Sequence, residues 1–152
     1  MSMKYRRLTA EELSGLEKEF INFLIVNGID AQQWEKIKSL DAGQAEKMID
    51  IFSDMIFEGI CSKVKYLEHF DTQGLKLFRC DDDLIRLTGI VPPQFFASVS
   101  EMLIHLSAHP DEYQRYHTSK AYMPDKNTEI FRMINAGAMI SDGQYYEHFQ
   151  NQ

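Results

Sequence analysis

Three residues in the second half of the chain have types and spacing that suit metal binding. Glu101, His105 and His109 follow one another at intervals of four residues. On an α-helix, side chains four residues apart lie on the same face. A carboxylate and two imidazoles are ligands that Zn²⁺ and related divalent metals prefer. The polar, solvated side of a helix has the same pattern, so both interpretations stay open.

The residues around this stripe limit the metal hypothesis. The pair reads His105-Leu-Ser-Ala-His109, without the Glu that follows the first His in His-Glu-x-x-His metalloenzymes and acts as their general base. Because Pro110 follows directly, His109 is expected at or beyond the end of its helix. A third ligand is expected from Glu101 or from His117. These four residues form the candidate metal site, and a small metal-dependent hydrolase is the function that it would serve.

Two acidic runs are weaker candidates. Asp81, Asp82 and Asp83 lack the spacing and the glycine of a calcium loop, so a turn between strands is favoured. Four further acidic residues follow one side of a helix, and we interpret them as a solvated face because no Glu-x-x-His motif of a di-iron site accompanies them. These residues are Glu46, Asp50, Asp54 and Glu58.

Other chemistry finds little support in the residues. No nucleophile elbow, phosphate-binding loop or dinucleotide-binding glycine motif occurs. Cys61 and Cys80 form no Cys-x-x-Cys pair, and we interpret them as reduced, partly buried thiols. The sequence therefore predicts no cofactor other than the divalent metal considered above.

Composition and charge exclude several classes of partner. The 152 residues carry a formal net charge of −7, which disfavours nucleic acid, and the one basic cluster, Lys4, Arg6 and Arg7, is interpreted as solvated. No apolar run is long enough to cross a membrane, and no apolar run follows the first charged residues as in a signal peptide. We expect a cytoplasmic protein that binds neither membranes nor nucleic acid.

The length and the hydrophobic periodicity predict an α+β fold, mainly helical, with residues 1–152 as a single domain. Residues 8–60 have helical spacing, with capping boxes at Thr9, Asp30 and Asp41 and a helix from about Thr9 to Asn27 that ends at Gly28. In that helix, Ile21 and Ile25 add a second apolar side, so its second half is expected to be buried on most faces.

The middle of the chain predicts a small sheet between two helical parts. Short apolar runs and turn residues over about residues 63–91 indicate a three-stranded antiparallel meander. After Pro92 and Pro93 the pattern is helical again. Helices are expected over about 94–108, from Pro110, and over 128–136, before a frayed tail.

The last forty residues are rich in tyrosine, which is enriched at protein interfaces. A partner-binding or dimer surface and ordinary half-buried packing both fit this enrichment. The candidate interaction surface contains Tyr113, Tyr116, Tyr145 and Tyr146, with Tyr122 nearby in sequence.

Four segments resemble a family of small bacterial proteins of unknown function. They are Met3-Lys-Tyr-Arg-Arg-Leu-Thr9, Lys65-Tyr-Leu-Glu-His69, Phe78-Arg-Cys-Asp-Asp-Asp83 and Glu129-Ile-Phe-Arg-Met133. The resemblance implies a bacterial cytosolic source. It implies no activity and gives no residue a role.

The sequence thus favours a non-enzymatic protein-interaction or adaptor domain, with a protein partner or a homodimer as the assembly. The alternative is the small metal-dependent hydrolase that would use the Glu/His/His stripe.

Overall fold

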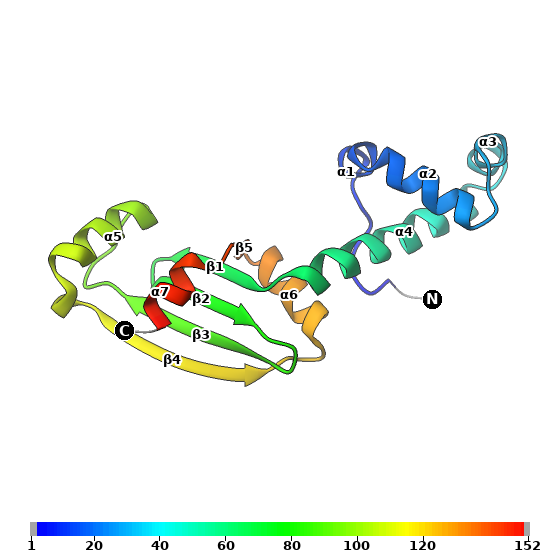
Figure 1. The fold of residues 1–152 in the computed structure, drawn as a ribbon. Coiled ribbons are helices and arrows are strands. Elements are labelled where there is room, and N and C mark those ends of the chain that lie inside the picture. Colours follow the sequence, from blue (N-terminus) through cyan, green and yellow to red (C-terminus); the bar gives the residue numbers. More distant parts are fainter. Residues whose placement is uncertain (1–2, 151–152) are drawn as a thin grey trace. The chain divides into compact units, whose positions relative to one another are not determined.

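The structure is a computed structural model that describes residues 3–150 (Figure 1). The chain divides into two compact units, one up to Ile60 and one from Cys61 onward. The N-terminal unit contains helices only, and the C-terminal unit is built around an antiparallel sheet. The α+β class expected from the sequence is confirmed, and the assignment of one domain to the whole chain stays a prediction.

The N-terminal unit begins with two short helices where the sequence predicted one. Helix α1 (Ala10–Gly15) is followed by α2 (Glu17–Val26), and Leu16 between them leaves the helical conformation with φ −112° and ψ 26°. Gly15 has a low helix propensity and weakens the helix at this point. The capping box of Thr9 is confirmed, and Gly28 takes a φ of 78° after α2, as expected.

Helices α3 (Ala31–Leu40) and α4 (Ala42–Lys63) complete this unit. The capping box of Asp30 is present, and the Asp41 carboxylate accepts the backbone N–H of Gln44 at 3.1 Å. The core is aromatic: Phe52 of α4 is fully buried, and its ring centroid lies 5.0 Å from that of Phe20 and 5.4 Å from that of Phe23. These rings dominate the apolar burial of the unit.

Three residues of the acidic row on α4, Asp50, Asp54 and Glu58, bind the start of the chain, so the predicted solvated face holds only for Glu46, which is 63% exposed. Arg7 donates two hydrogen bonds to the Asp50 carboxylate, from Nε at 2.6 Å and from Nη2 at 3.1 Å. Asp54 accepts the backbone N–H groups of Lys4 and Tyr5 at 2.8 and 2.9 Å. The carboxylates thus hold an extended basic segment against the helix.

The same segment is fixed at both of its ends. The Lys4 ammonium lies 3.0 Å from the Glu58 carboxylate, and the Tyr5 hydroxyl also donates to Glu58. Further along, the buried N–H of Leu8 donates to Ser53 Oγ at 2.9 Å. The basic cluster and the acidic row, which the sequence presented as two separate solvated features, are therefore two sides of one contact.

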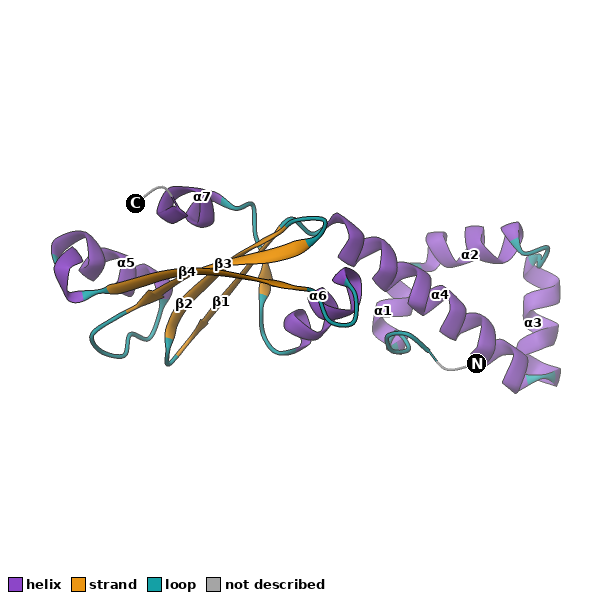
Figure 2. Ribbon diagram, turned by 90° about the horizontal axis from the view of Figure 1, so that it is seen from below, coloured by secondary structure: helices purple, strands orange, loops and turns teal. Residues whose placement is uncertain are grey.

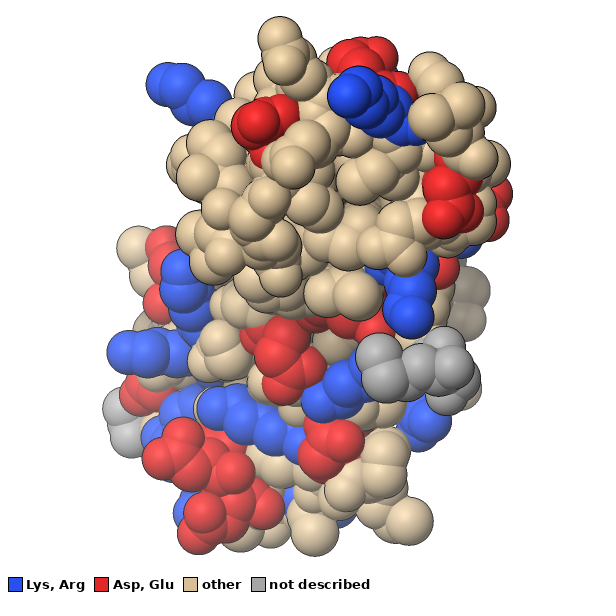
Figure 3. All heavy atoms as spheres, turned by 90° about the vertical axis from the view of Figure 1, so that its right-hand side faces the viewer, with Lys and Arg blue, Asp and Glu red and all other residues tan. Residues whose placement is uncertain are grey.

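Helix α2 leaves part of its apolar surface uncovered in the described part of the chain. Ile21, Ile25 and Val26 are 46%, 60% and 85% exposed. The prediction that this half of the helix is buried on most faces is therefore wrong, because only the Phe20–Phe23–Leu24 side contacts the core. Figure 3 shows a broad area without charged side chains in its upper part, where α2 and α3 lie.

The C-terminal unit contains a five-stranded antiparallel sheet with the order β4-β3-β2-β1-β5 (Figure 1). The predicted meander is confirmed as β1 (Tyr66–Asp71), β2 (Gly74–Cys80) and β3 (Leu84–Val91). The C-terminal part adds β4 (Gln114–Ala121) and the short β5 (Met139–Ile140) at the two edges.

Strand β4 corrects the prediction that the regular elements after Pro93 are all helices. It pairs with β3 along its whole length, from Val91 opposite Gln114 to Leu84 opposite Ala121. Almost all of its residues are exposed, so its sequence lacks the apolar alternation of a half-buried strand. Backbone hydrogen bonds to β3, rather than side-chain burial, define it as a strand.

Helices cover both faces of the sheet. The remaining elements are α5 (Val99–Ala108), the 3₁₀ helix η1 (Pro110–Glu112), α6 (Lys126–Asn135) and α7 (Gln144–Gln150), and the last replaces the expected frayed tail. The first face, which carries Leu75 and Leu77, packs against α5 and α7. The second face, which carries Leu67 and Ile85, packs against α6. Figure 2 shows α6 and α7 on opposite sides of the strands.

None of the helices within residues 3–150 combines the length and the apolar character needed to span a bilayer.

Candidate functional site

A cluster of two histidines and one glutamate forms where α5 ends. Helix α5 begins later than predicted, after Ser98, whose side chain accepts the Glu101 N–H at 3.2 Å. It ends at His109, whose N–H donates to the His105 carbonyl at 2.8 Å. Pro110 then opens η1, as the sequence predicted, and this turn brings Glu112 back towards His109.

The three side chains lie close enough to share a ligand. The His105 and His109 ring centroids are 4.6 Å apart, and His109 Nδ1 lies 3.1 Å from the Glu112 carboxylate. One potential ligand atom from each residue lies within 4.8 Å of the other two. His109 and Glu112 are about half exposed, at 53% and 51%, so the cluster opens to solvent.

Tyr113 fixes the orientation of the His105 ring. Its hydroxyl lies 3.0 Å from His105 Nδ1 and donates to the Met102 carbonyl at 3.1 Å. A phenol has one hydrogen to donate. With that hydrogen directed to Met102, the Tyr113 oxygen accepts from His105 Nδ1–H, which leaves the lone pair of His105 on Nε2. Phe96 packs against the same imidazole, with 5.1 Å between ring centroids.

The structure thus brings together two of the four predicted ligands and supplies a third that the prediction missed. Glu101 is an exposed residue in the first turn of α5 and is not part of the cluster. His117 lies on β4, where its Nδ1 is 2.9 Å from the buried Thr88 hydroxyl of β3. Glu112 has the spacing of three residues from His109 that a helical turn brings together, and this was the available signal.

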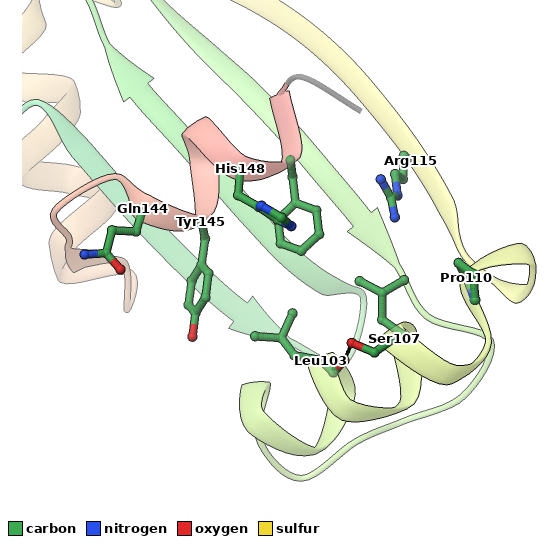
Figure 4. A pocket seen from close by; sticks show the side chains of 9 residues that line it. Leu103, Ser107, Pro110, Arg115, Gln144, Tyr145 and His148 are labelled. Atoms are coloured by element: carbon green, nitrogen blue, oxygen red, sulfur yellow. Dashed lines mark hydrogen bonds between the residues drawn. The ribbon is translucent and has the colours of Figure 1, made fainter.

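A pocket of about 580 Å³ lies on the first face of the sheet (Figure 4). It lies beside α5, α7 and β4. The Arg115 guanidinium of β4 stacks over the Phe149 ring of α7 at 5.4 Å, and His148 adds an imidazole. The residues that line the pocket are Leu103, Leu106, Ser107, Pro110, Arg115, Gln144, Tyr145, His148 and Phe149.

The chemistry of this lining is half apolar and half hydrogen-bonding. Arg115 contributes a positively charged guanidinium group, and the apolar side chains of Leu103 and Leu106 line the same space. No carboxylate is among the lining residues, so the wall itself does not repel an anion. Such a lining suits a small molecule that carries both an acidic group and an apolar part.

The predicted tyrosine surface divides into buried and exposed members. Tyr113 and Tyr146 are 8% and 3% exposed and belong to the core between the sheet, α5 and α7. Tyr116 and Tyr145 are 39% and 38% exposed. The Tyr116 ring covers Gly89 of β3, where a Cβ atom would lie 2.1 Å from Tyr116 Cζ.

The acidic run between β2 and β3 forms a turn with arginines as its partners. The Asp81 carboxylate accepts hydrogen bonds from Arg79 and Arg86, each at 3.0 Å. Burial alone would raise the pKa of Asp81, but the two guanidinium groups outweigh it and hold this pKa below its ordinary value. Asp82 and Asp83 are exposed. Within residues 3–150, no metal-binding group includes these carboxylates.

Comparison with known proteins decides the family. Residues 3–152 match a family of unknown function, DUF6495. The chain belongs to this family. The match spans every element described above, and it confirms the resemblance to a family without an assigned function. No curated protein and no solved structure matches the chain.

Proposed function

We propose that the protein is a non-catalytic protein-interaction domain that associates with a second copy of itself through α2. The observation that carries the proposal is the exposure of Ile21, Ile25 and Val26 on one helix. Ile21 and Ile25 are one helical turn apart, so their side chains are neighbours on the surface. We call these three residues the α2 surface. Exposed apolar residues that are contiguous mark interaction sites.

A second copy of the chain is the occupant that this surface fits best. The stretch from Phe20 to Ile29 contains no charged residue, while the chain as a whole carries a net charge of −7. Contact through most other surfaces would bring like charges together. Around a two-fold axis, the α2 surface meets its own copy, so apolar residues cover apolar residues without any opposing charge.

The test is the mass of the full-length chain in solution, measured by sedimentation equilibrium over a range of concentrations. We expect a dimer for the native chain and a monomer for Ile25→Glu, because a carboxylate at the centre of the α2 surface would face its copy. The matched control is Ile104→Glu. Ile104 is 74% exposed on α5, and this variant should dimerise like the native chain.

Two outcomes would overturn the proposal. One is a native chain that stays monomeric at every concentration. The other is a dimer that Ile25→Glu leaves intact while its circular dichroism spectrum matches that of the native chain. Val26→Lys is a second variant of the same surface, at a position 85% exposed, where a charge has no effect on the core. It should dissociate the dimer as Ile25→Glu does.

A cytoplasmic location is part of this proposal. Cys61 and Cys80 are both buried and form no disulfide. Reduced thiols fit a compartment that keeps cysteine reduced.

A further inference from the structure

We propose that His105, His109 and Glu112 form a zinc-binding site at the junction of α5 and η1. The site is independent of the α2 surface, since it lies in the C-terminal unit and uses none of the same residues. The juxtaposition of two imidazoles and a carboxylate within 4.8 Å carries the inference.

The donor set selects the class of metal. Two neutral imidazoles and one carboxylate are the protein ligands of many zinc sites, whereas Mg²⁺ and Ca²⁺ prefer oxygen ligands throughout. Three protein ligands leave a coordination position for water in a tetrahedral complex. One carboxylate and two neutral rings also leave the bound ion with a positive charge, which the acidic chain tolerates well, given its net charge of −7.

The backbone sets two of the ligands before any metal arrives. His105 and His109 are four residues apart at the end of α5, so their rings lie one above the other. Pro110 begins η1 immediately afterwards and directs Glu112 onto the His109 ring. The contact of 3.1 Å between His109 Nδ1 and the Glu112 carboxylate places the second ligand beside the third.

Tyr113 is the positioning residue of the site. Through its hydrogen bond to His105 Nδ1, it keeps the ring in one orientation and leaves Nε2 as the coordinating atom. Tyr113 is itself 8% exposed and anchored to the Met102 carbonyl, so its hydroxyl has a fixed place. This arrangement matches the outer-sphere hydrogen bonds that orient histidine ligands in metal sites.

Small side-chain movements complete the coordination sphere. Zinc binds nitrogen and oxygen at about 2.0–2.2 Å, so ligand atoms must approach one another more closely than their present separations of up to 4.8 Å. His109 and Glu112 are about half exposed and can rotate towards an ion without disturbing the buried Met102 and Leu106 of α5. The core is therefore unaffected by occupancy of the site.

The experiment is a calorimetric titration of Zn²⁺ into the full-length chain, without an affinity tag and after removal of metal with a chelator. We expect one ion per chain. His109→Ala and Glu112→Gln should each abolish this binding, while the control His148→Ala, which removes an exposed imidazole on α7, should bind as the native chain does. Tyr113→Phe should weaken binding about 10- to 100-fold, as losses of orienting hydrogen bonds do.

Cobalt supplies a second readout that folding alone does not change. The visible absorption of Co²⁺ should report tetrahedral coordination in the native chain and in Tyr113→Phe, and it should disappear in Glu112→Gln. A native chain that takes up no Zn²⁺ would overturn the proposal, and so would His109→Ala and Glu112→Gln variants that bind it as tightly as the native chain does. Equal affinity of Tyr113→Phe and the native chain would overturn the positioning role.

Discussion

The contact between Ser53 and Leu8 allows a sharp prediction about how the start of the chain is held. Ser53 is fully buried in α4, accepts the Leu8 N–H at 2.9 Å and donates to the Ile49 carbonyl at 2.7 Å. Ser53→Ala removes the acceptor and leaves the N–H of Leu8, a 5% exposed residue, without a partner. A buried donor without a partner costs about 1–3 kcal/mol.

A smaller effect of opposite sign reduces this loss. Alanine is the better helix former by about 0.5 kcal/mol, so the net loss of stability should be about 0.5–2.5 kcal/mol. Ser39→Ala is the matched control. Ser39 also donates to the carbonyl four residues earlier, that of Glu35, at 2.9 Å, but it is exposed. Its substitution should change stability by no more than about 0.5 kcal/mol.

Urea unfolding followed by tryptophan fluorescence measures the stability of the N-terminal unit, which contains Ser53. Trp34 is the single tryptophan of the chain, and it lies in the N-terminal unit with its ring centroid 5.2 Å from that of Phe20. Ser53→Ala should lower the midpoint without changing the slope of the transition. The reasoning is refuted if Ser53→Ala and Ser39→Ala unfold at the same urea concentration.

Three further perturbations have defined outcomes. The hydrogen bond from Arg6, with the backbone bond from Thr9, lowers the pKa of Glu12 to about 2. The Glu12 carboxylate therefore stabilises the fold fully above pH 4.5, the ordinary pKa of the group, and this stabilisation is lost as the pH falls towards 2. In acid unfolding, Glu12→Gln should lose stability less steeply than the native chain over that range. Burial raises the pKa of Cys80 to about 11, so iodoacetamide at neutral pH should alkylate this thiol only after unfolding, as mass spectrometry of timed samples can show. Gly89→Ala should displace the ring of Tyr116 and lower the urea midpoint of unfolding. The double variant with Tyr116→Ala should have almost the same midpoint as Gly89→Ala, because the ring contact is already lost.

Local signals in the sequence predicted the local structure well. The capping boxes at Thr9 and Asp30 fix their helix starts because the interaction involves only neighbouring residues. The apolar stripe of α4 and the meander could also be predicted, because burial of one side gives their hydrophobic residues a regular spacing. Strand β4 was missed because its polar residues, exposed at the sheet edge, show no such period.

The candidate metal cluster was half predictable. Helical spacing brought His105 and His109 together, and the same rule wrongly favoured Glu101. Glu112 belongs to a new turn that begins at Pro110, where the geometry of α5 no longer applies. The pocket near Arg115 could not be predicted, because it forms only when α7 packs near α5, about forty residues earlier in the chain.

Helix α7 has a consequence for how the protein is made. Its Tyr146 and Phe149, which complete the core over the first face of the sheet, follow all five strands in the chain, so the ribosome adds them after the strands. Until they leave the exit tunnel, Leu75 and Leu77 on the nascent strands lack part of their cover. The C-terminal unit therefore reaches its final packing only after translation of this helix, and until then the uncovered apolar side chains of the strands favour aggregation.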